Sequence, residues 1–214
     1  QVLAGNPRIT PCGELSLISD IASVAGLSPE SLIAPQKAAE LALDYERAVR
    51  RIFPNADIAT DKQPSNLMYV GLIKQMFPNA PIVHTVRRPL DNILSVYFLH
   101  LDPSMAYAFD LMDIAHWYRQ CQRLATHWRT IYPNTFIDFD YDAFVASPAE
   151  KGKALFDALG LPWSEAYLAI DQRVNAVKTA SVWQVRETLH GRSSGRWRNY
   201  QRHLEKVRAY LDNA

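Results

Sequence analysis

The stretch Pro81–Ser95, which reads PIVHTVRRPLDNILS, decides the fold. Its first six residues form a short apolar run rich in β-branched side chains, which is typical of a buried strand. Two arginines close that run, and Pro89 follows, a residue that helices favour in their first turn. A strand that passes almost directly into a helix is the building unit of an α/β fold.

The same alternation continues on both sides of this unit. Further strands are expected at 57–60 and 135–140. Helical spacing of apolar residues predicts helices at about 14–25, 29–52, 66–77, 89–101, 110–131 and 147–160, the second of them opened by Ser28 and Pro29. Strands separated by helices predict an α/β fold with a parallel sheet and helices on both faces. Ligands in such folds bind at the carboxyl ends of the strands.

Composition describes an ordinary globular chain. It has 214 residues, 48% of them hydrophobic, with 23 Lys and Arg against 22 Asp and Glu. These values favour one domain over residues 1–214, and the net charge of +1 argues against a nucleic-acid or membrane partner. Two distant cysteines predict neither a disulfide nor a zinc site. No signal peptide or apolar run of membrane-spanning length is present, so we expect a cytoplasmic protein.

Two of the predicted strand ends carry cations suited to an anionic ligand. Arg87 lies where the strand 81–86 meets the following helix, whose free N–H groups attract anions, and Ser95 can add a hydroxyl two turns later. An Arg–Asp pair that only caps the helix is the alternative. Lys62 follows the strand 57–60 and is either poised over an anion or a solvated loop lysine.

A basic segment follows between Arg173 and Arg208. It holds nine basic residues against two acidic ones, whereas the rest of the chain has a net charge of −6. Within it, RSSGRW at 192–197 combines small residues with cations, as a loop that folds over a phosphate does. Interleaved Trp and Tyr residues are also compatible with base stacking, but the acidic remainder disfavours a nucleic-acid surface.

Several of these blocks, in this order, resemble the sulfotransferases that use 3′-phosphoadenosine 5′-phosphosulfate (PAPS). The resemblance is strongest to the tetratricopeptide-linked and tyrosylprotein-sulfotransferase-like branch, and it covers nearly the whole chain. The blocks that carry it are CGEL at 12–15, DKQP at 61–64, FPNAPIVH at 77–84, 87–95, 118–128, GLPW at 160–163, TASVWQVR at 179–186 and RSSGRW at 192–197.

The resemblance implies a P-loop-like sulfotransferase fold and a role for each motif. Arg87 and Ser95 would hold the 3′-phosphate of the cofactor, with Arg192, Ser193 and Ser194 closing over it. Lys62, with Ser193 or Ser194, would stabilise the leaving group, and Glu14 would be the base. The reaction moves a sulfuryl group from PAPS to an acceptor hydroxyl, leaves adenosine 3′,5′-bisphosphate and is expected to need no metal.

The resemblance also bears on what is expected upstream, on an alternative function and on the acceptor. The family's 5′-phosphosulfate loop and first strand are expected upstream of Gln1, together with tetratricopeptide repeats, so the sequence is interpreted as N-terminally incomplete and inactive alone. A non-catalytic nucleotide-binding or interaction module derived from this fold is the alternative function. The acceptor is left open among a protein tyrosine, a saccharide and a small molecule.

Overall fold

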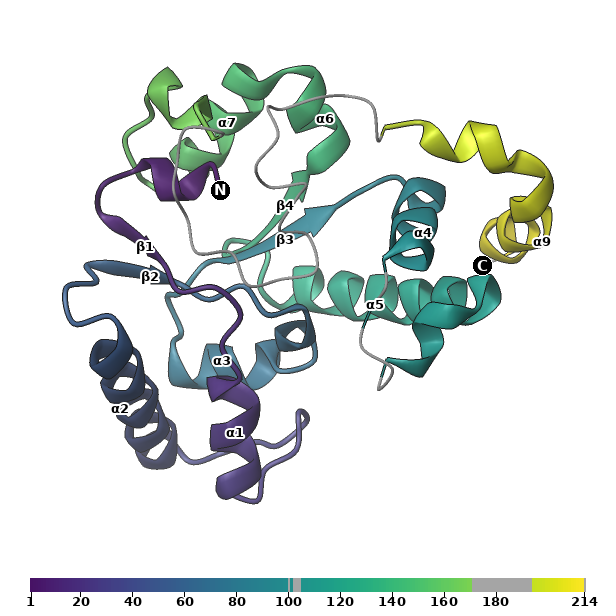
Figure 1. The fold of residues 1–214 in the computed structure, drawn as a ribbon. Coiled ribbons are helices and arrows are strands. Elements are labelled where there is room, and N and C mark those ends of the chain that lie inside the picture. The colour runs from purple at the N-terminus through teal and green to yellow at the C-terminus, as the bar shows by residue number, and fades with distance from the viewer. Residues whose placement is uncertain (100, 102–104, 171–193, 214) are drawn as a thin grey trace.

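The computed structural model describes residues 1–99, 101, 105–170 and 194–213. Four parallel strands alternate along it with helices (Figure 1). The strands are β1 (Ile9–Pro11), β2 (Ile58–Thr60), β3 (Ile82–Val86) and β4 (Phe136–Asp140). The α-helices are α1 (Leu17–Val24), α2 (Pro35–Ile52), α3 (Val70–Met76), α4 (Pro89–Phe98), α5 (Leu111–Ile131), α6 (Tyr141–Ala146), α7 (Pro148–Ala158) and α9 (Gln201–Asp212). The predicted α/β fold is confirmed.

The strands form two parallel pairs within the described residues. β1 pairs with β2, with Ile9 opposite Ile58, and β3 pairs with β4, with Ile82 opposite Phe136. The three predicted strands are present, each starting one residue later than expected. β1 was not predicted, because three residues that end in proline give no readable period. The strand 57–60 therefore pairs with a segment that sequence periodicity does not reveal.

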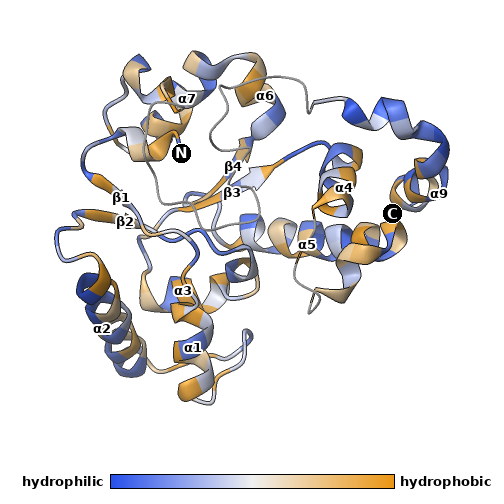
Figure 2. Ribbon diagram, viewed as in Figure 1, coloured by the Kyte–Doolittle hydropathy of each residue, from blue (hydrophilic) through white to orange (hydrophobic). Residues whose placement is uncertain are grey.

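Helices cover both faces of the β3–β4 pair. Val83 and Phe139 point to one face, where they pack with the buried Phe156 of α7. Ile82 and Phe136 lie on the other face, against α3 and α5. Alternate residues of each strand thus serve opposite cores, as the pleat requires. Figure 2 shows hydrophobic residues in the strands and in parts of the helices, which also carry many hydrophilic residues.

Two further clusters pack helix against helix. One joins α1, α2 and α3 through Ile18, Leu41 and Leu72. The other joins α4, α5 and α9 through Ile93, Ile114 and Leu204. The second cluster matters for the site, because it anchors the chain after residue 194 beside α4. α9 was not predicted. The sequence 201–212 is rich in charged residues, and these mask the apolar stripe that contains Leu204 and Val207.

Three predicted helix starts are wrong, each for a local reason. The helix expected at 66–77 begins at Val70, because Pro64–Leu67 forms a separate 3-10 turn. The helix expected at 29–52 begins at Pro35, because a residue before proline avoids the helical region and Ala34 is extended, with ψ 147°. Ser28 and Pro29 form a separate turn. The helix expected at 14–25 begins at Leu17. Gly13 has a positive φ of 76°, so the chain turns at this residue and enters the helix only afterwards. Glu14 is therefore not a first-turn helix residue.

Lys74 should be the most costly lysine to replace for stability. It is 5% exposed, and its Nζ donates to the carbonyl oxygens of Pro78 (2.5 Å) and Ala80 (2.9 Å), in the turn that leads into β3. Lys74→Met keeps the packing but leaves two carbonyls without a donor, so we expect a loss of about 2–4 kcal/mol in the free energy of unfolding. Urea denaturation measures it.

The control is Lys153→Met, because that lysine is exposed and pairs with Asp157 one turn away. It should change the free energy of unfolding by less than about 0.5 kcal/mol. Equal effects of the two substitutions would show that Lys74 does not hold the turn.

Candidate active site

Glu14 and Lys62 meet at the carboxyl ends of the β1–β2 pair. The backbone pairing continues past both strands, since the Cys12 N–H donates to the Thr60 carbonyl (2.9 Å) and the Lys62 N–H donates to the Gly13 carbonyl (2.8 Å). This ladder sets the two side chains next to each other, and Lys62 Nζ donates to Glu14 Oε1. The Lys62 side chain is 66% exposed and Glu14 33% exposed, so both are open to a ligand. Desolvation lowers the pKa of Lys62.

Asp61 holds the turn that carries Glu14. Its carboxylate accepts a hydrogen bond from the Leu15 N–H (3.3 Å) and another from the Tyr45 hydroxyl of α2 (3.0 Å). Burial raises the pKa of Asp61 despite these hydrogen bonds, and burial beside Asp61 raises the pKa of Tyr45. Asp61 therefore ties the strand end, the Glu14 turn and α2 together.

Arg87 and Arg88 lie at the carboxyl end of β3, immediately before α4. The Arg87 guanidinium lies over the ring of Tyr141, 5.4 Å from its centre. The Arg88 backbone N–H donates to Asp142 Oδ2 (2.8 Å), at the end of neighbouring β4. Burial raises the pKa of Asp142, but its hydrogen bonds to Arg88 and Ser194 and the two arginine charges outweigh burial and lower it overall. The two strand ends thus combine arginines with an ionised, hydrogen-bonded carboxylate.

The segment 194–200 returns to this point from the far end of the chain. Ser194 donates to Asp142 Oδ1 (2.7 Å) and accepts from Arg88 Nη1 (3.1 Å). The backbone N–H of Gly195 donates to Asp91 Oδ2 (2.6 Å). Gly195 has a positive φ of 79°, and a Cβ there would lie 2.6 Å from Arg198 Nη1. Any other residue would be strained by this left-handed backbone and would also displace the Arg198 guanidinium group.

Ser95 stands one turn beyond Asp91 on α4, on the helix face that meets the segment 194–200. Phe98, one turn further along this face, contacts that segment: its ring centre lies 5.3 Å from the centre of the Tyr200 ring and 4.9 Å from the Arg196 guanidinium carbon. Arg87 and Ser95 thus belong to one strand–helix unit, as predicted. Arg192 and Ser193 lie outside the described residues, as does much of the basic segment.

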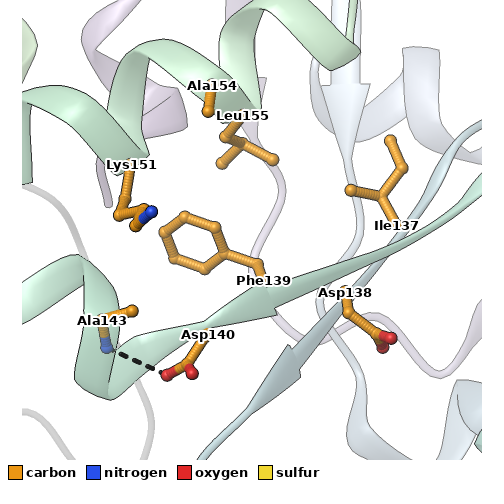
Figure 3. A pocket seen from close by; sticks show the side chains of 8 residues that line it. All are labelled: Ile137, Asp138, Phe139, Asp140, Ala143, Lys151, Ala154 and Leu155. Carbon is orange, nitrogen blue, oxygen red and sulfur yellow. Dashed lines mark hydrogen bonds between the residues drawn. The ribbon is translucent and has the colours of Figure 1, made fainter.

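A pocket of about 350 Å³ lies elsewhere, between β4 and α7 (Figure 3). Phe139, Ala154 and Leu155 give it an apolar lining, with Lys151 and Asp140 at its edge. None of the predicted site residues lines it. Because an anionic ligand needs converging charges and not an apolar hollow, we place the candidate site at the strand ends. In the described part of the chain, no His, Cys, Asp and Glu side chains gather to hold a metal ion.

Asp142 and Arg88 belong to the candidate site but were not predicted as site residues from the sequence. Asp142 follows strand 135–140 just as Arg87 follows strand 81–86, so the same strand-end argument would have found it. Arg88 was seen as a strand-end cation but given no role. Asp91 accepts the backbone N–H groups of Gly195 and Trp197. That pairing joins residues more than a hundred positions apart, which no local pattern reveals.

Two groups of side chains thus lie at strand ends: a carboxylate with a lysine, and an arginine cluster at the start of a helix. They are suited to proton removal and to holding anions.

A model of the sulfotransferase family matches residues 1–165. The chain belongs to the sulfotransferase family. It is also 30% identical to an uncharacterized protein of Aquifex aeolicus (strain VF5), over 97% of this chain but only 29% of that protein.

Solved sulfotransferase domains share this fold. The sulfotransferase domain of the Synechococcus PCC 7002 olefin synthase superposes with a TM-score of 0.66 at 22% identity, covering 92% of this chain and 80% of that one. The sulfotransferase domain from the curacin biosynthetic pathway gives 0.71 at 13% identity, covering 99% and 91%. Among the residues that the structure describes, no helix has the length and apolarity to cross a membrane.

Proposed function

We propose that this sulfotransferase moves a sulfuryl group from PAPS to an acceptor hydroxyl. The contact between Glu14 and Lys62 carries the proposal, because it puts a carboxylate and an ammonium group side by side at the strand ends. Family membership supports sulfuryl transfer, and the donor and the site residues are our inference.

The residues at the start of α4 fit the 3′-phosphate that distinguishes PAPS. Arg87 and Arg88 offer fixed N–H donors, and the helix N-terminus adds its partial positive charge. Gly195 contributes a left-handed backbone with no side chain, which leaves room between Arg88 and Arg198. These features are typical of phosphate sites.

The bound donor would supply a sulfuryl group attached to a phosphate oxygen. The bond between sulfur and that oxygen breaks as the acceptor oxygen forms the new S–O bond, and the phosphate leaves with the bonding electrons. Glu14 takes the proton of the acceptor hydroxyl, acting as general base. Lys62 stabilises the negative charge that develops on the departing phosphate oxygen. Its ammonium group has three N–H donors, so one can remain on Glu14 while the others face an anion.

The acceptor class is proposed only as a hydroxyl compound, which includes a protein tyrosine, a saccharide or a small alcohol. Both matched structures are described as domains of biosynthetic systems, which favours a small-molecule acceptor for this chain too. Membership of the tetratricopeptide-linked branch stays a prediction. A non-catalytic nucleotide-binding module stays the second candidate, favoured if bisphosphate binds but no transfer is found.

The test measures binding and transfer in the full-length protein that contains this chain. We expect tight binding of adenosine 3′,5′-bisphosphate by calorimetry and release of that product from PAPS with an acceptor panel. Arg87→Ala should weaken bisphosphate binding roughly 10- to 150-fold, the scale of one charge-assisted hydrogen bond. Such a loss would link the product site to the end of β3.

The matched control is Arg8→Ala. Arg8 precedes β1, at the amino end of its strand, and pairs with the exposed Asp57. Its removal should leave bisphosphate affinity unchanged. A wild-type protein that binds neither PAPS nor the bisphosphate would overturn the proposed function.

A further inference from the structure

Asp91 is a buried carboxylate whose partners come from a distant part of the chain. It is 2% exposed and lies in the first turn of α4. Its two oxygens accept from the backbone N–H groups of Gly195 (2.6 Å) and Trp197 (3.0 Å). A buried charge is tolerated only when hydrogen bonds compensate it, and here the helix N-terminus helps. Asp91 therefore specifies the path of the chain at 195–197.

Asp142 fixes the preceding residue from the other side. It is 7% exposed, and its oxygens accept from the Arg88 backbone N–H (2.8 Å) and the Ser194 hydroxyl (2.7 Å). The same carboxylate, in the first turn of α6, thus links the end of β3 to Ser194. Two buried acids hold a short segment at both of its ends.

Ser194 has a single hydroxyl hydrogen, and Asp142 takes it. The oxygen of Ser194 in turn accepts from Arg88 Nη1 (3.1 Å). In this arrangement Ser194 has no hydrogen to give to a phosphate. Its bonding pattern is that of a structural link between a carboxylate and a guanidinium group.

We propose that Asp91 and Asp142 are positioning residues that fix the segment Ser194–Trp197 at the start of α4, and that Ser194 belongs to this latch and is not a phosphate donor. The inference rests on the proposed function, because it assigns the latch to the 3′-phosphate site. Its consequence is that Arg88, Arg196 and Arg198 are held close to α4 before any ligand binds. The two acids would then act on affinity through the placement of these arginines.

The experiment compares two ligands that differ by one phosphate, adenosine 3′,5′-bisphosphate and adenosine 5′-monophosphate, in the full-length protein. Asp91→Asn should weaken binding of the bisphosphate roughly tenfold and leave binding of the monophosphate unchanged. The KM for PAPS should rise by a similar factor, with kcat at saturating PAPS unchanged. A role limited to general stability would lower the affinity for both ligands together.

Asp110→Asn is the matched control, because Asp110 also accepts two backbone N–H groups, those of Met112 and Asp113, at the start of α5. It should leave both ligand affinities unchanged. Amide hydrogen exchange supplies a second measurement: Asp91→Asn should speed exchange at Gly195 and Trp197, and Asp110→Asn should not.

Ser194→Ala tests the second part of the proposal and keeps it testable if Asp91→Asn does not fold. Asp142 also accepts from the Arg88 N–H, so Asp142→Asn should weaken bisphosphate binding at least as much as Ser194→Ala. If Ser194 acts only through Asp142, the double variant should weaken binding by the same factor as Asp142→Asn alone. Additive losses would show that Ser194 binds phosphate itself and would overturn its assignment to the latch.

Unchanged bisphosphate affinity in Asp91→Asn would overturn the positioning role, while the proposed function would stand. A wild-type protein that binds the two nucleotides equally would instead refute the 3′-phosphate site, and with it both proposals.

Discussion

Glu14→Gln is expected to lower turnover roughly 10²- to 10⁴-fold, the usual contribution of a general base. The amide keeps the size of the side chain and its acceptor oxygen toward Lys62, but it cannot take the proton of the acceptor hydroxyl. Affinity for adenosine 3′,5′-bisphosphate should stay nearly the same, since the residues proposed to hold that phosphate lie at the ends of β3 and β4. Steady-state kinetics with PAPS in the full-length protein measures the first effect, and calorimetry measures the second.

The control for this variant is Glu150→Gln, which changes another exposed carboxylate of α7 that also pairs with a lysine, Lys151. Its turnover should equal that of the wild type. Normal turnover in Glu14→Gln would remove Glu14 from the mechanism and leave its contact with Lys62 as a structural ion pair.

Lys62→Met should lower kcat roughly 10²- to 10³-fold, the loss seen when one preorganised donor to a developing negative charge is removed. The expected signature is in the pH profile. Because desolvation lowers the pKa of Lys62 below the ordinary value of 10.5, wild-type kcat should fall on the alkaline side before an ordinary lysine would lose its proton. Lys62→Arg should recover part of the activity and move that alkaline limb upward, since arginine stays charged.

Lys151→Met is the corresponding lysine control and should leave both kcat and the pH profile unchanged. If Lys62→Met keeps full activity, or if Lys62→Arg leaves the alkaline limb in place, Lys62 does not stabilise the leaving group.

The parts of the fold that follow from local patterns could be predicted from the sequence. The run 81–86 and the following Pro89 marked a strand and a helix start because β-branched residues and proline restrict the backbone directly. The position of Arg87 at a strand end followed from the same reasoning. The contact between Lys62 and Glu14 did not, because it depends on β1, which is too short to show a period.

What the sequence could not reveal depends on long-range pairing. Asp91 looks like an ordinary first-turn helix acid, and only the folded chain shows that its partners are the N–H groups of Gly195 and Trp197. The starts of α1 and α2 were predicted too early for a different reason. Apolar residues at helical spacing also occur upstream of Leu17 and Pro35, where the backbone still turns. The roles of Arg192 and Ser193 remain predictions, because those residues lie outside the described part of the chain.

The division of the strands into two pairs has a consequence for protein engineering. The proposed base and leaving-group cation sit on the β1–β2 pair, whereas the residues proposed to recognise the donor's 3′-phosphate are anchored by β3, β4 and α4. Hydrogen bonds within each pair hold its own strand ends in register, so a library that varies the neighbours of Glu14 and Lys62, with these two residues kept, leaves the anchor points on β3, β4 and α4 unaltered. The chemical step proposed for Glu14 and Lys62 can thus be altered while the residues proposed to bind the donor stay as they are, which makes separate optimisation of turnover and donor affinity possible.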